Sequence, residues 1–159
     1  MSAALQQQAR LVAVDGFQAS GKTTIARALG VGLGRRVISA DDYLHRHQGS
    51  FFVNLDIERL AADVQALDSC VLEGVCCLQV LEAIGETSDC LVYVKRMAKW
   101  GWAEEDELEK YAVQGVAHLS KPTEPLAISL RTLWDEVARY HIQFQPHVVA
   151  TITYERSEA

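Results

Sequence analysis

The segment Gly16–Thr23, which reads GFQASGKT, constrains the fold of this chain more than any other feature. It matches the pattern GxxxxGK[ST], in which glycines let successive backbone N–H groups curl around phosphate oxygens. Lys22 is placed to reach the outer phosphates, and the Thr23 hydroxyl is placed to bind Mg²⁺. The apolar run Leu11–Val14 precedes the motif and a helix-forming segment follows it, as a phosphate loop requires. The segment therefore predicts binding of a nucleoside triphosphate.

The residues expected to contact the nucleotide belong to this loop and to the first turn of the helix that follows. They are Gly16, Gln18, Ala19, Ser20, Gly21, Lys22, Thr23 and Thr24. The positive end of that helix points at the bound anion. We expect ATP and Mg²⁺ as the cofactors, with Thr23 as one of the metal ligands.

Length and composition favour one globular domain over residues 1–159. The chain is 49% apolar and 23% charged, which suits one core and leaves little length for a second. Residues 1–9 and 155–159 are expected to be flexible tails. The chain has 15 basic and 21 acidic residues, and this net charge of −6 argues against a broad nucleic-acid surface.

The first residues lack the basic and apolar regions of a leader, and no apolar run approaches the roughly 18 residues of a membrane span. We therefore expect a cytoplasmic protein with neither a membrane nor a nucleic acid as partner. No feature of the sequence indicates the oligomeric state. The partners expected are a nucleoside triphosphate and a small-molecule acceptor.

Apolar runs alternate with helical patterns along the chain, which favours an α/β fold. The runs that are typical of buried strands cover residues 10–15, 36–40, 70–74, 90–94 and 148–153. Continuous apolar strands that alternate with helices indicate a parallel sheet covered on both faces. We expect a three-layer P-loop NTPase fold, with a five-stranded parallel sheet in the strand order 2-3-1-4-5.

Polar residues follow several of these expected strands. Asp41 and Asp42 follow the second strand, Glu73 ends the third, and Lys95–Lys99 follow the fourth. Ligands of open α/β sheets bind beyond the carboxyl ends of the strands, so these residues and the phosphate loop are expected around one crevice.

Phosphoryl transfer needs a base near the acceptor hydroxyl and a metal to neutralise charge. Asp41 is a candidate for the base, and a turn or helix cap is its alternative role. Glu73 ends an apolar strand, where an unpaired charge is costly, so we expect it to bind Mg²⁺ directly or through water. A structural ion pair is the alternative role for Glu73.

Several segments resemble the uridine kinase group of P-loop kinases, which includes nucleoside, phosphoribulose and pantothenate kinases. They are the loop GFQASGKTT, the segment Ile38–Tyr43, the segment Val71–Val75, and the region from Tyr140 through Pro146 to the last strand. The resemblance implies that Lys22 binds the phosphates, that Thr23 and Glu73 bind Mg²⁺, and that Asp41 is the base.

The chain also departs from this group. Such kinases have an arginine-rich lid after the fourth strand, whereas this segment offers Lys95, Arg96 and Lys99. Arg96 is the expected catalytic lid cation, and a plain surface role is its alternative. Asp42, Tyr43 and His45 follow the candidate base and are expected to contact the acceptor. Their alternatives are a cap for Asp42 and an exposed loop for the histidine.

The hypothesis that these features favour is an ATP-dependent kinase that phosphorylates a hydroxyl of a small molecule, such as a nucleoside or a sugar-like or vitamin-like metabolite. Its catalytic residues would be Asp41, Lys22 and Arg96. The alternative is a nucleotide-binding regulatory or scaffold protein without transfer activity, which the sparse lid and the short chain suggest. A GTPase switch is disfavoured, because the sequence has no NKxD motif and has Glu73-Gly74 where DxxG would follow the third strand.

Overall fold

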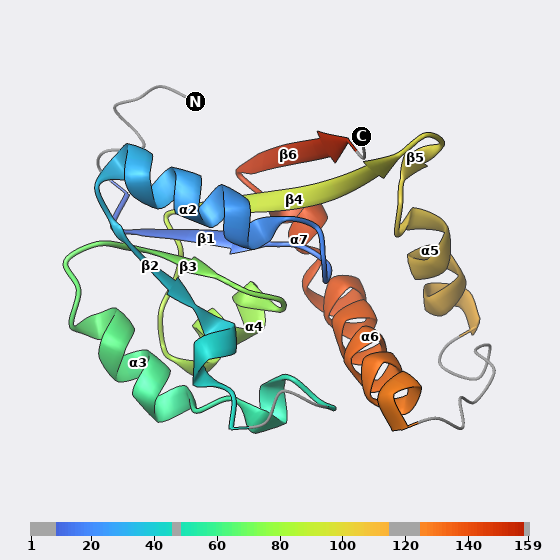
Figure 1. Ribbon diagram of the computed structural model, residues 1–159, viewed down its shortest axis with the longest axis horizontal. Helices are drawn as coiled ribbons and strands as arrows, with labels where there is room; N and C mark the ends of the chain where they lie inside the picture. Colours follow the sequence, from blue (N-terminus) through green and yellow to red (C-terminus); the bar gives the residue numbers. More distant parts are fainter. Residues whose placement is uncertain (1–8, 46–48, 115–124, 158–159) are drawn as a thin grey trace.

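The chain folds as a mainly parallel β-sheet with helices on both faces (Figure 1). The computed structural model describes residues 9–45, 49–114 and 125–157. The strands are β1 (Leu11–Asp15), β2 (Arg36–Ser39), β3 (Cys70–Glu73), β4 (Cys90–Ala98), β5 (Gly101–Trp102) and β6 (Ile152–Ser157). The α-helices are α2 (Lys22–Leu33), α3 (Ile57–Gln65), α4 (Cys77–Ala83), α5 (Glu105–Gln114), α6 (Pro125–Phe144) and α7 (Pro146–Val149). Two short 3-10 helices are η1 (Ala40–Tyr43) and η2 (Phe52–Asn54).

The parallel strands stand in the order β2-β3-β1-β4-β6. This confirms the expected order 2-3-1-4-5, with β6 as the fifth parallel strand. Near the end of β1, Val14 pairs with Glu73 of β3 and with Val92 of β4, so the phosphate loop leaves the sheet between these two strands. An additional short strand, β5, pairs antiparallel with the end of β4.

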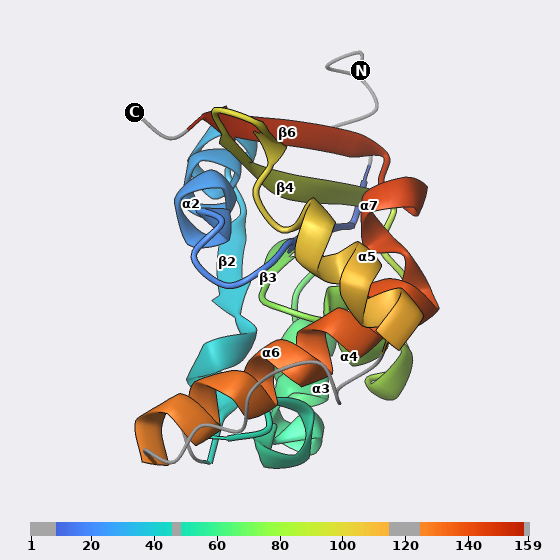
Figure 2. The same cartoon turned by 90° about the vertical axis from the view of Figure 1, so that its right-hand side faces the viewer.

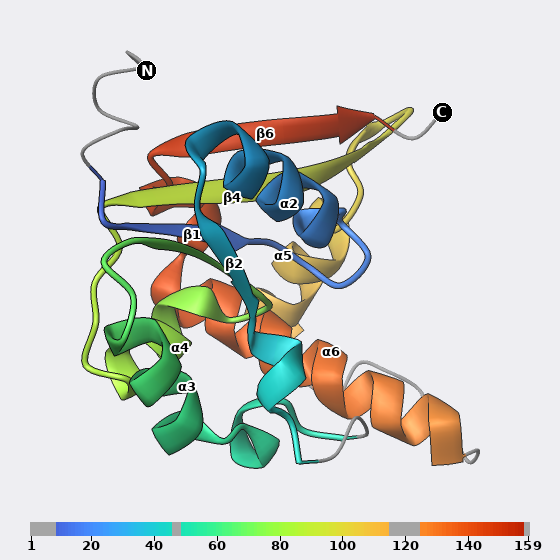
Figure 3. The same cartoon turned by 60° about the vertical axis from the view of Figure 1, so that its left-hand side comes forward.

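Alternate residues of β1 face opposite sides of the sheet, and each side has its own core. Val12 and Val14 pack with the apolar residues of α2. Leu11 and Ala13 pack with residues of α3, α4 and α6. The ribbon accordingly shows α2 on one side of the sheet and α3, α4 and α6 on the other (Figure 3). All five residues of β1 are buried, as expected for a strand covered on both faces.

The end of the chain differs from the prediction. Residues 148–149 belong to the short helix α7, which begins at Pro146 because proline suits a first helical turn. The last strand, β6, starts at Ile152 and continues to Ser157. Residues 155–157 therefore belong to a strand paired with β4 and not to a tail. Residues 1–8 and 158–159, the remainder of the expected tails apart from the buried Ala9, lie outside the described residues.

All four cysteines, Cys70, Cys76, Cys77 and Cys90, are buried and free. They pack as small apolar residues in the two cores. Burial raises the pKa of each thiol above its ordinary value. Within the described ranges, no helix is both long and apolar enough to cross a membrane.

Candidate functional site

The loop between β1 and α2 has the backbone shape that its sequence predicts. Gly16 and Gly21 have φ angles of 152° and 98°, and Ala19 adopts a left-handed conformation at 57°. At Gly16 a Cβ atom would lie 2.6 Å from the carbonyl oxygen of Val94, so no side chain fits there. The glycines are thus required by the path of the loop.

Lys22 is the first residue of α2 and is 8% exposed. Its Nζ donates a hydrogen bond of 2.6 Å to the carbonyl oxygen of Phe17, which holds the ammonium group across the loop. Lys22 also lines the cavity beside the loop. Its charge is therefore available to an anion that enters this cavity.

The cavity has a volume of about 410 Å³, which is within the range of small-molecule sites. Residues from the phosphate loop, η1, the segment before η2, the end of β3, α6 and β6 form its wall. These residues are Gln18, Ala19, Gly21, Lys22, Thr23, Asp41, Leu44, Gly49, Ser50, Phe51, Glu73, Val75, Leu133 and Arg156. Among the other predicted nucleotide contacts, Gly16 and Ser20 are buried within the loop and Thr24 is exposed on α2; none of the three lines the cavity.

Glu73 ends β3 and is 3% exposed. Its Oε1 accepts hydrogen bonds from the hydroxyls of Ser39, at 2.6 Å, and Thr23, at 3.2 Å. A carboxylate beside a hydroxyl supplies the hard oxygen ligands that Mg²⁺ prefers. In the described ranges, no three His, Cys, Asp or Glu side chains form a metal cluster.

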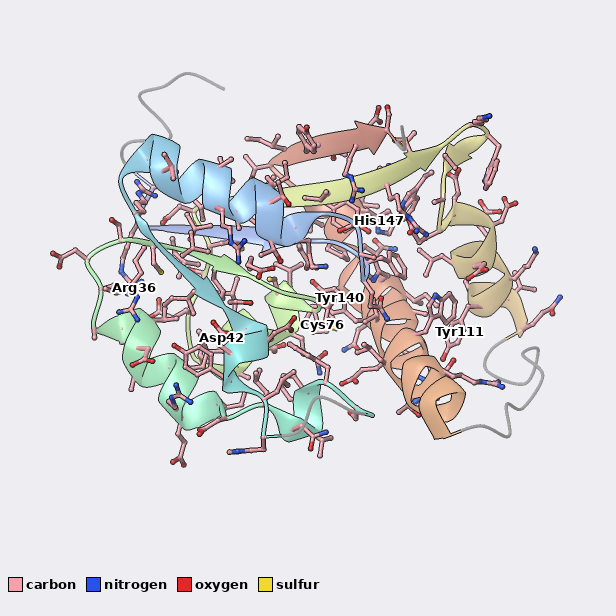
Figure 4. All side chains as sticks on the ribbon, in the orientation of Figure 1. Arg36, Asp42, Cys76, Tyr111, Tyr140 and His147 are labelled. Atoms are coloured by element: carbon pink, nitrogen blue, oxygen red, sulfur yellow. The ribbon has the colours of Figure 1, made fainter. Side chains whose placement is uncertain are left out.

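Asp41 lines the same cavity from η1. The strand that was expected to carry it ends at Ser39, and the chain then turns into η1. Asp41 is exposed, so it can meet a molecule that enters from solvent. Asp42, also exposed on η1, is not among the residues that line the cavity (Figure 4).

Tyr43, which was expected to contact the acceptor, does not line the cavity. Its side chain is buried, and its hydroxyl donates to Asp63 Oδ2 at 2.6 Å. Burial and the bonded carboxylate raise the pKa of Tyr43 to about 12. The guanidinium of Arg59 lies 4.8 Å from the centre of its ring. Tyr43 therefore fastens η1 to α3, which fixes the position of Asp41.

His45 also lies outside the cavity wall. It is exposed, and its backbone N–H donates to the carbonyl oxygen of Asn54 at 2.8 Å. This pairing folds the segment 49–55 back onto the chain after η1. As a result Leu44 and Phe51, rather than His45, face the cavity.

Arg96 lies on β4, away from this cavity. Its Nη2 forms an ion pair of 2.8 Å with Glu104 Oε1. Together with Phe17 and Gln18 it lines a separate cavity of about 260 Å³. The structure therefore does not place the expected lid cation in the wall of the cavity that contains Lys22 and Thr23.

The sequence interpretation missed Arg156, which lines the larger cavity from β6. Its Nη1 donates to the carbonyl oxygen of Ala19 at 3.2 Å. The residue falls in the segment that was expected to be a tail, because β6 is mostly exposed and carries no apolar run. Arg156 belongs to the site because β6 continues beside β4 as far as Ser157. The sequence carries no clear signal of this length.

The role of α6 was also not predicted. In Figure 2 this helix runs below the strands, on the same side as α3 and α4. The carboxylate of Glu136 accepts hydrogen bonds from Ser50 Oγ at 3.1 Å, Phe51 N at 2.6 Å and Phe52 N at 2.8 Å. One turn earlier, Leu133 lines the cavity. Helix α6 therefore holds the segment 50–52, of which Ser50 and Phe51 line the cavity.

The carboxylate of Asp15 binds the backbone at the start of the phosphate loop. It is fully buried and accepts hydrogen bonds from Gly16 N at 2.7 Å, Cys77 N at 3.2 Å and the hydroxyl of Tyr140. Tyr140 reaches it from α6 and lies near α4 (Figure 4). Burial raises the pKa of Asp15 to about 6, although its hydrogen bonds oppose the rise.

His141 is the neighbouring buried group on α6. Its ring stacks on Phe17 of the loop, with 4.0 Å between the ring centres. Nδ1 lies 2.7 Å from the carbonyl oxygen of Val137, so this nitrogen carries the proton, and Nε2 accepts from the Tyr93 hydroxyl at 2.8 Å. Burial lowers the pKa of His141 to about 3, so the ring is neutral near pH 7.

The chain is similar in fold to solved structures that include proteins described as kinases. A protein described as a possible uridine kinase, from Bacillus stearothermophilus, has a TM-score of 0.55 and 17% identity over 91% of this chain and 87% of that chain. Shikimate kinase from Acinetobacter baumannii, solved with shikimate, has a TM-score of 0.50 and 14% identity over 96% of this chain and 87% of that chain. No protein-family model matches the sequence, and no curated protein matches it. The fold is that of P-loop kinases, which confirms the resemblance to the uridine kinase group at the level of the fold.

Proposed function

We propose that the protein transfers a phosphoryl group from ATP to a hydroxyl of a small molecule. The observation that carries this proposal is the shared cavity of about 410 Å³, which is lined by Lys22 and Thr23 of the phosphate loop, by Glu73 and by Asp41. These residues come from separate parts of the sequence and offer the groups that phosphoryl transfer needs. The kinases with the same fold support the reaction class.

The nucleotide side of the cavity is the phosphate loop. Its backbone N–H groups and the ammonium of Lys22 would hold the phosphates and offset their charge. Thr23 and Glu73 would hold Mg²⁺, since their oxygens lie 3.2 Å apart and suit this ion. When bound, Mg²⁺ would neutralise charge on the transferring group.

The acceptor side of the cavity is formed by Asp41 together with Leu44, Phe51 and Val75. The exposed carboxylate of Asp41 would accept the proton of the acceptor hydroxyl. The apolar side chains would exclude water and pack against the carbon skeleton of the acceptor. A nucleoside or a sugar-like or vitamin-like metabolite has both a hydroxyl and such a skeleton.

One observation favours the alternative of a nucleotide-binding protein without transfer activity. Arg96, the expected lid cation, is paired with Glu104 and does not line the cavity. Under this alternative, titration calorimetry would detect MgATP binding while no acceptor yields a phosphorylated product. Mass spectrometry of the reaction mixtures would separate the two proposals.

The test is an ATP-turnover assay across a panel of nucleosides, sugars and other small alcohols. Asp41→Asn is expected to lower turnover on a productive acceptor by about 10²- to 10⁴-fold with little change in nucleotide affinity, because it removes only the base. Lys22→Ala is expected to weaken nucleotide binding itself. Asp68→Asn, which changes an exposed carboxylate outside the cavity, is the matched control. Turnover that Asp41→Asn leaves intact on every acceptor would rule out the assigned base.

A further inference from the structure

A second cation reaches the phosphate loop from the last strand. Strand β6 runs parallel to β4, so its carboxyl end lies at the same edge of the sheet as the loop. From this end, Arg156 Nη1 donates to the carbonyl oxygen of Ala19 at 3.2 Å. Arg156 also lines the cavity that contains Lys22 and Thr23. Two basic side chains, far apart in sequence, thus border one anion site.

Gly21 makes this close approach possible. A Cβ atom at Gly21 would lie only 3.0 Å from both Cδ and Nη1 of Arg156. The arginine side chain therefore lies directly against the bare backbone of the loop. Lys22 is 8% exposed whereas Arg156 is exposed, so the lysine reaches the loop from the protein interior and the arginine from the solvent side.

Arg96 and Arg156 differ in the partners that hold their guanidinium groups. The two residues pair in register on adjacent strands. Arg96 forms its ion pair with Glu104, and that carboxylate satisfies its charge. The hydrogen bond that fixes Arg156 goes to a neutral carbonyl group, which leaves its charge uncompensated by that contact. A guanidinium has several N–H donors in a planar fork, which matches the oxygens of a phosphate.

We propose that Arg156 binds the phosphate oxygens of the nucleotide. The bond to Ala19 orients the guanidinium, and the remaining N–H groups contact the phosphates. This cation compensates for the lack of an arginine-rich lid, because it reaches the loop from β6. The proposal rests on the nucleotide site of the proposed function but not on the transfer reaction.

The test measures binding by titration calorimetry with three probes, namely MgATP, MgADP and inorganic tripolyphosphate. Arg156→Ala is expected to weaken the binding of MgATP and of tripolyphosphate on the order of 10- to 100-fold, which is the usual effect of losing a hydrogen bond to a charged group. Arg156→Lys keeps the charge but loses the planar fork. Its affinity is therefore expected to lie between that of the wild type and that of Arg156→Ala. The difference between Arg156→Ala and the wild type should shrink as salt is added.

The matched control is Arg27→Ala, which removes the same charge from an exposed position on α2 outside the cavity. It accounts for the change in net charge, and circular dichroism of each variant checks that it is folded. The inference is overturned if Arg156→Ala binds tripolyphosphate as tightly as Arg27→Ala does. A loss of affinity for MgATP and MgADP without a loss for tripolyphosphate would place Arg156 on the base or ribose, which also overturns it.

Failure of this inference and failure of the proposed function give different results. If Lys22→Ala weakens all three probes while Arg156→Ala changes none, only the role of Arg156 is wrong. If the wild type binds none of them, the nucleotide site itself is wrong and both proposals fail. An absence of phosphorylated product leaves the binding test of Arg156 intact.

Discussion

Glu73 is a buried carboxylate that accepts hydrogen bonds from the hydroxyls of Ser39 and Thr23. We expect Glu73→Gln to weaken Mg²⁺ binding by about 10- to 100-fold, because the amide keeps the size of the side chain but removes its negative charge. The measurement is the affinity for ADP with and without Mg²⁺. Only the Mg²⁺-dependent part of the affinity should fall.

The control for this change is Glu82→Gln, which alters an exposed carboxylate on α4. An equal loss of ADP affinity with and without Mg²⁺ would contradict the role of Glu73 as a metal ligand. Such a result would instead indicate a change in the shape of the loop.

Asp15 is expected to give the protein a measurable pH dependence. Burial raises its pKa from 3.8 to about 6, so between these values the folded state holds a proton that the unfolded state has lost. The contribution of Asp15 to stability is therefore present at low pH and falls as the pH rises toward about 6. A shift of about two pKa units corresponds to about 3 kcal/mol. The measurement is the free energy of unfolding in urea at several pH values for the wild type and Asp15→Asn.

The difference between these two proteins isolates Asp15 from the other titrating groups. His141, whose pKa is lowered to about 3, acts in the opposite direction, since its contribution is lost as the pH falls. A difference that does not change between pH values below 4 and above 6 would show that Asp15 keeps its ordinary pKa in the fold.

Single residues differ in how far the sequence predicts them. The positions of Lys22 and Thr23 follow from a contiguous motif, in which spacing along the chain sets spacing in space. The positions of Tyr43 and Arg96 depend on Asp63 and Glu104, partners that only tertiary packing supplies. The sequence therefore predicts the shape of the loop, whereas four candidate residues that it placed at the site lie outside the cavity wall: Asp42, Tyr43, His45 and Arg96.

At the scale of elements, Glu136 of α6 holds the segment 50–52, which we propose to lie on the acceptor side of the cavity. Glu136→Ala removes the acceptor for two backbone N–H groups, those of Phe51 and Phe52, and for the Ser50 hydroxyl. We expect a loss of about 2 kcal/mol in unfolding free energy, since groups left without partners pay a desolvation cost. Urea unfolding measures this loss. The acceptor KM should rise while nucleotide affinity changes little.

Gln143→Ala, on the exposed face of the same helix, is the control for this prediction. If both variants unfold at the same urea concentration, the hydrogen bonds of Glu136 contribute nothing net. Equal effects on acceptor and nucleotide binding would show that α6 acts on the whole cavity rather than on the segment 50–52.

Strands differ in how clearly their sequence patterns predict them. The central strands are buried on both faces, so their apolar runs identify them. Strand β6 pairs with β4 but is largely exposed, and its polar residues resemble a tail. Its actual length depends on backbone pairing with β4, which side-chain patterns do not record.

At the scale of the whole molecule, the strand order is the prediction with the largest consequence. It places the ends of β2, β3 and β1 side by side, which brings Asp41 and Glu73 to one cavity with the phosphate loop. The rule that ligands bind beyond the carboxyl ends of the strands anticipates this grouping. The same rule cannot indicate that α6 closes the wall, because that contact comes from the packing of a helix against a loop.

The buried cysteines have a practical consequence for experiments on this protein. All four native thiols are enclosed in the cores and their pKa values are raised, so they are poor nucleophiles in the folded state. A cysteine introduced on the surface would then be modified selectively, without first removing the native ones. Fluorescent or spin labels could be attached at chosen positions around the cavity, and distances between them followed as ligands are added.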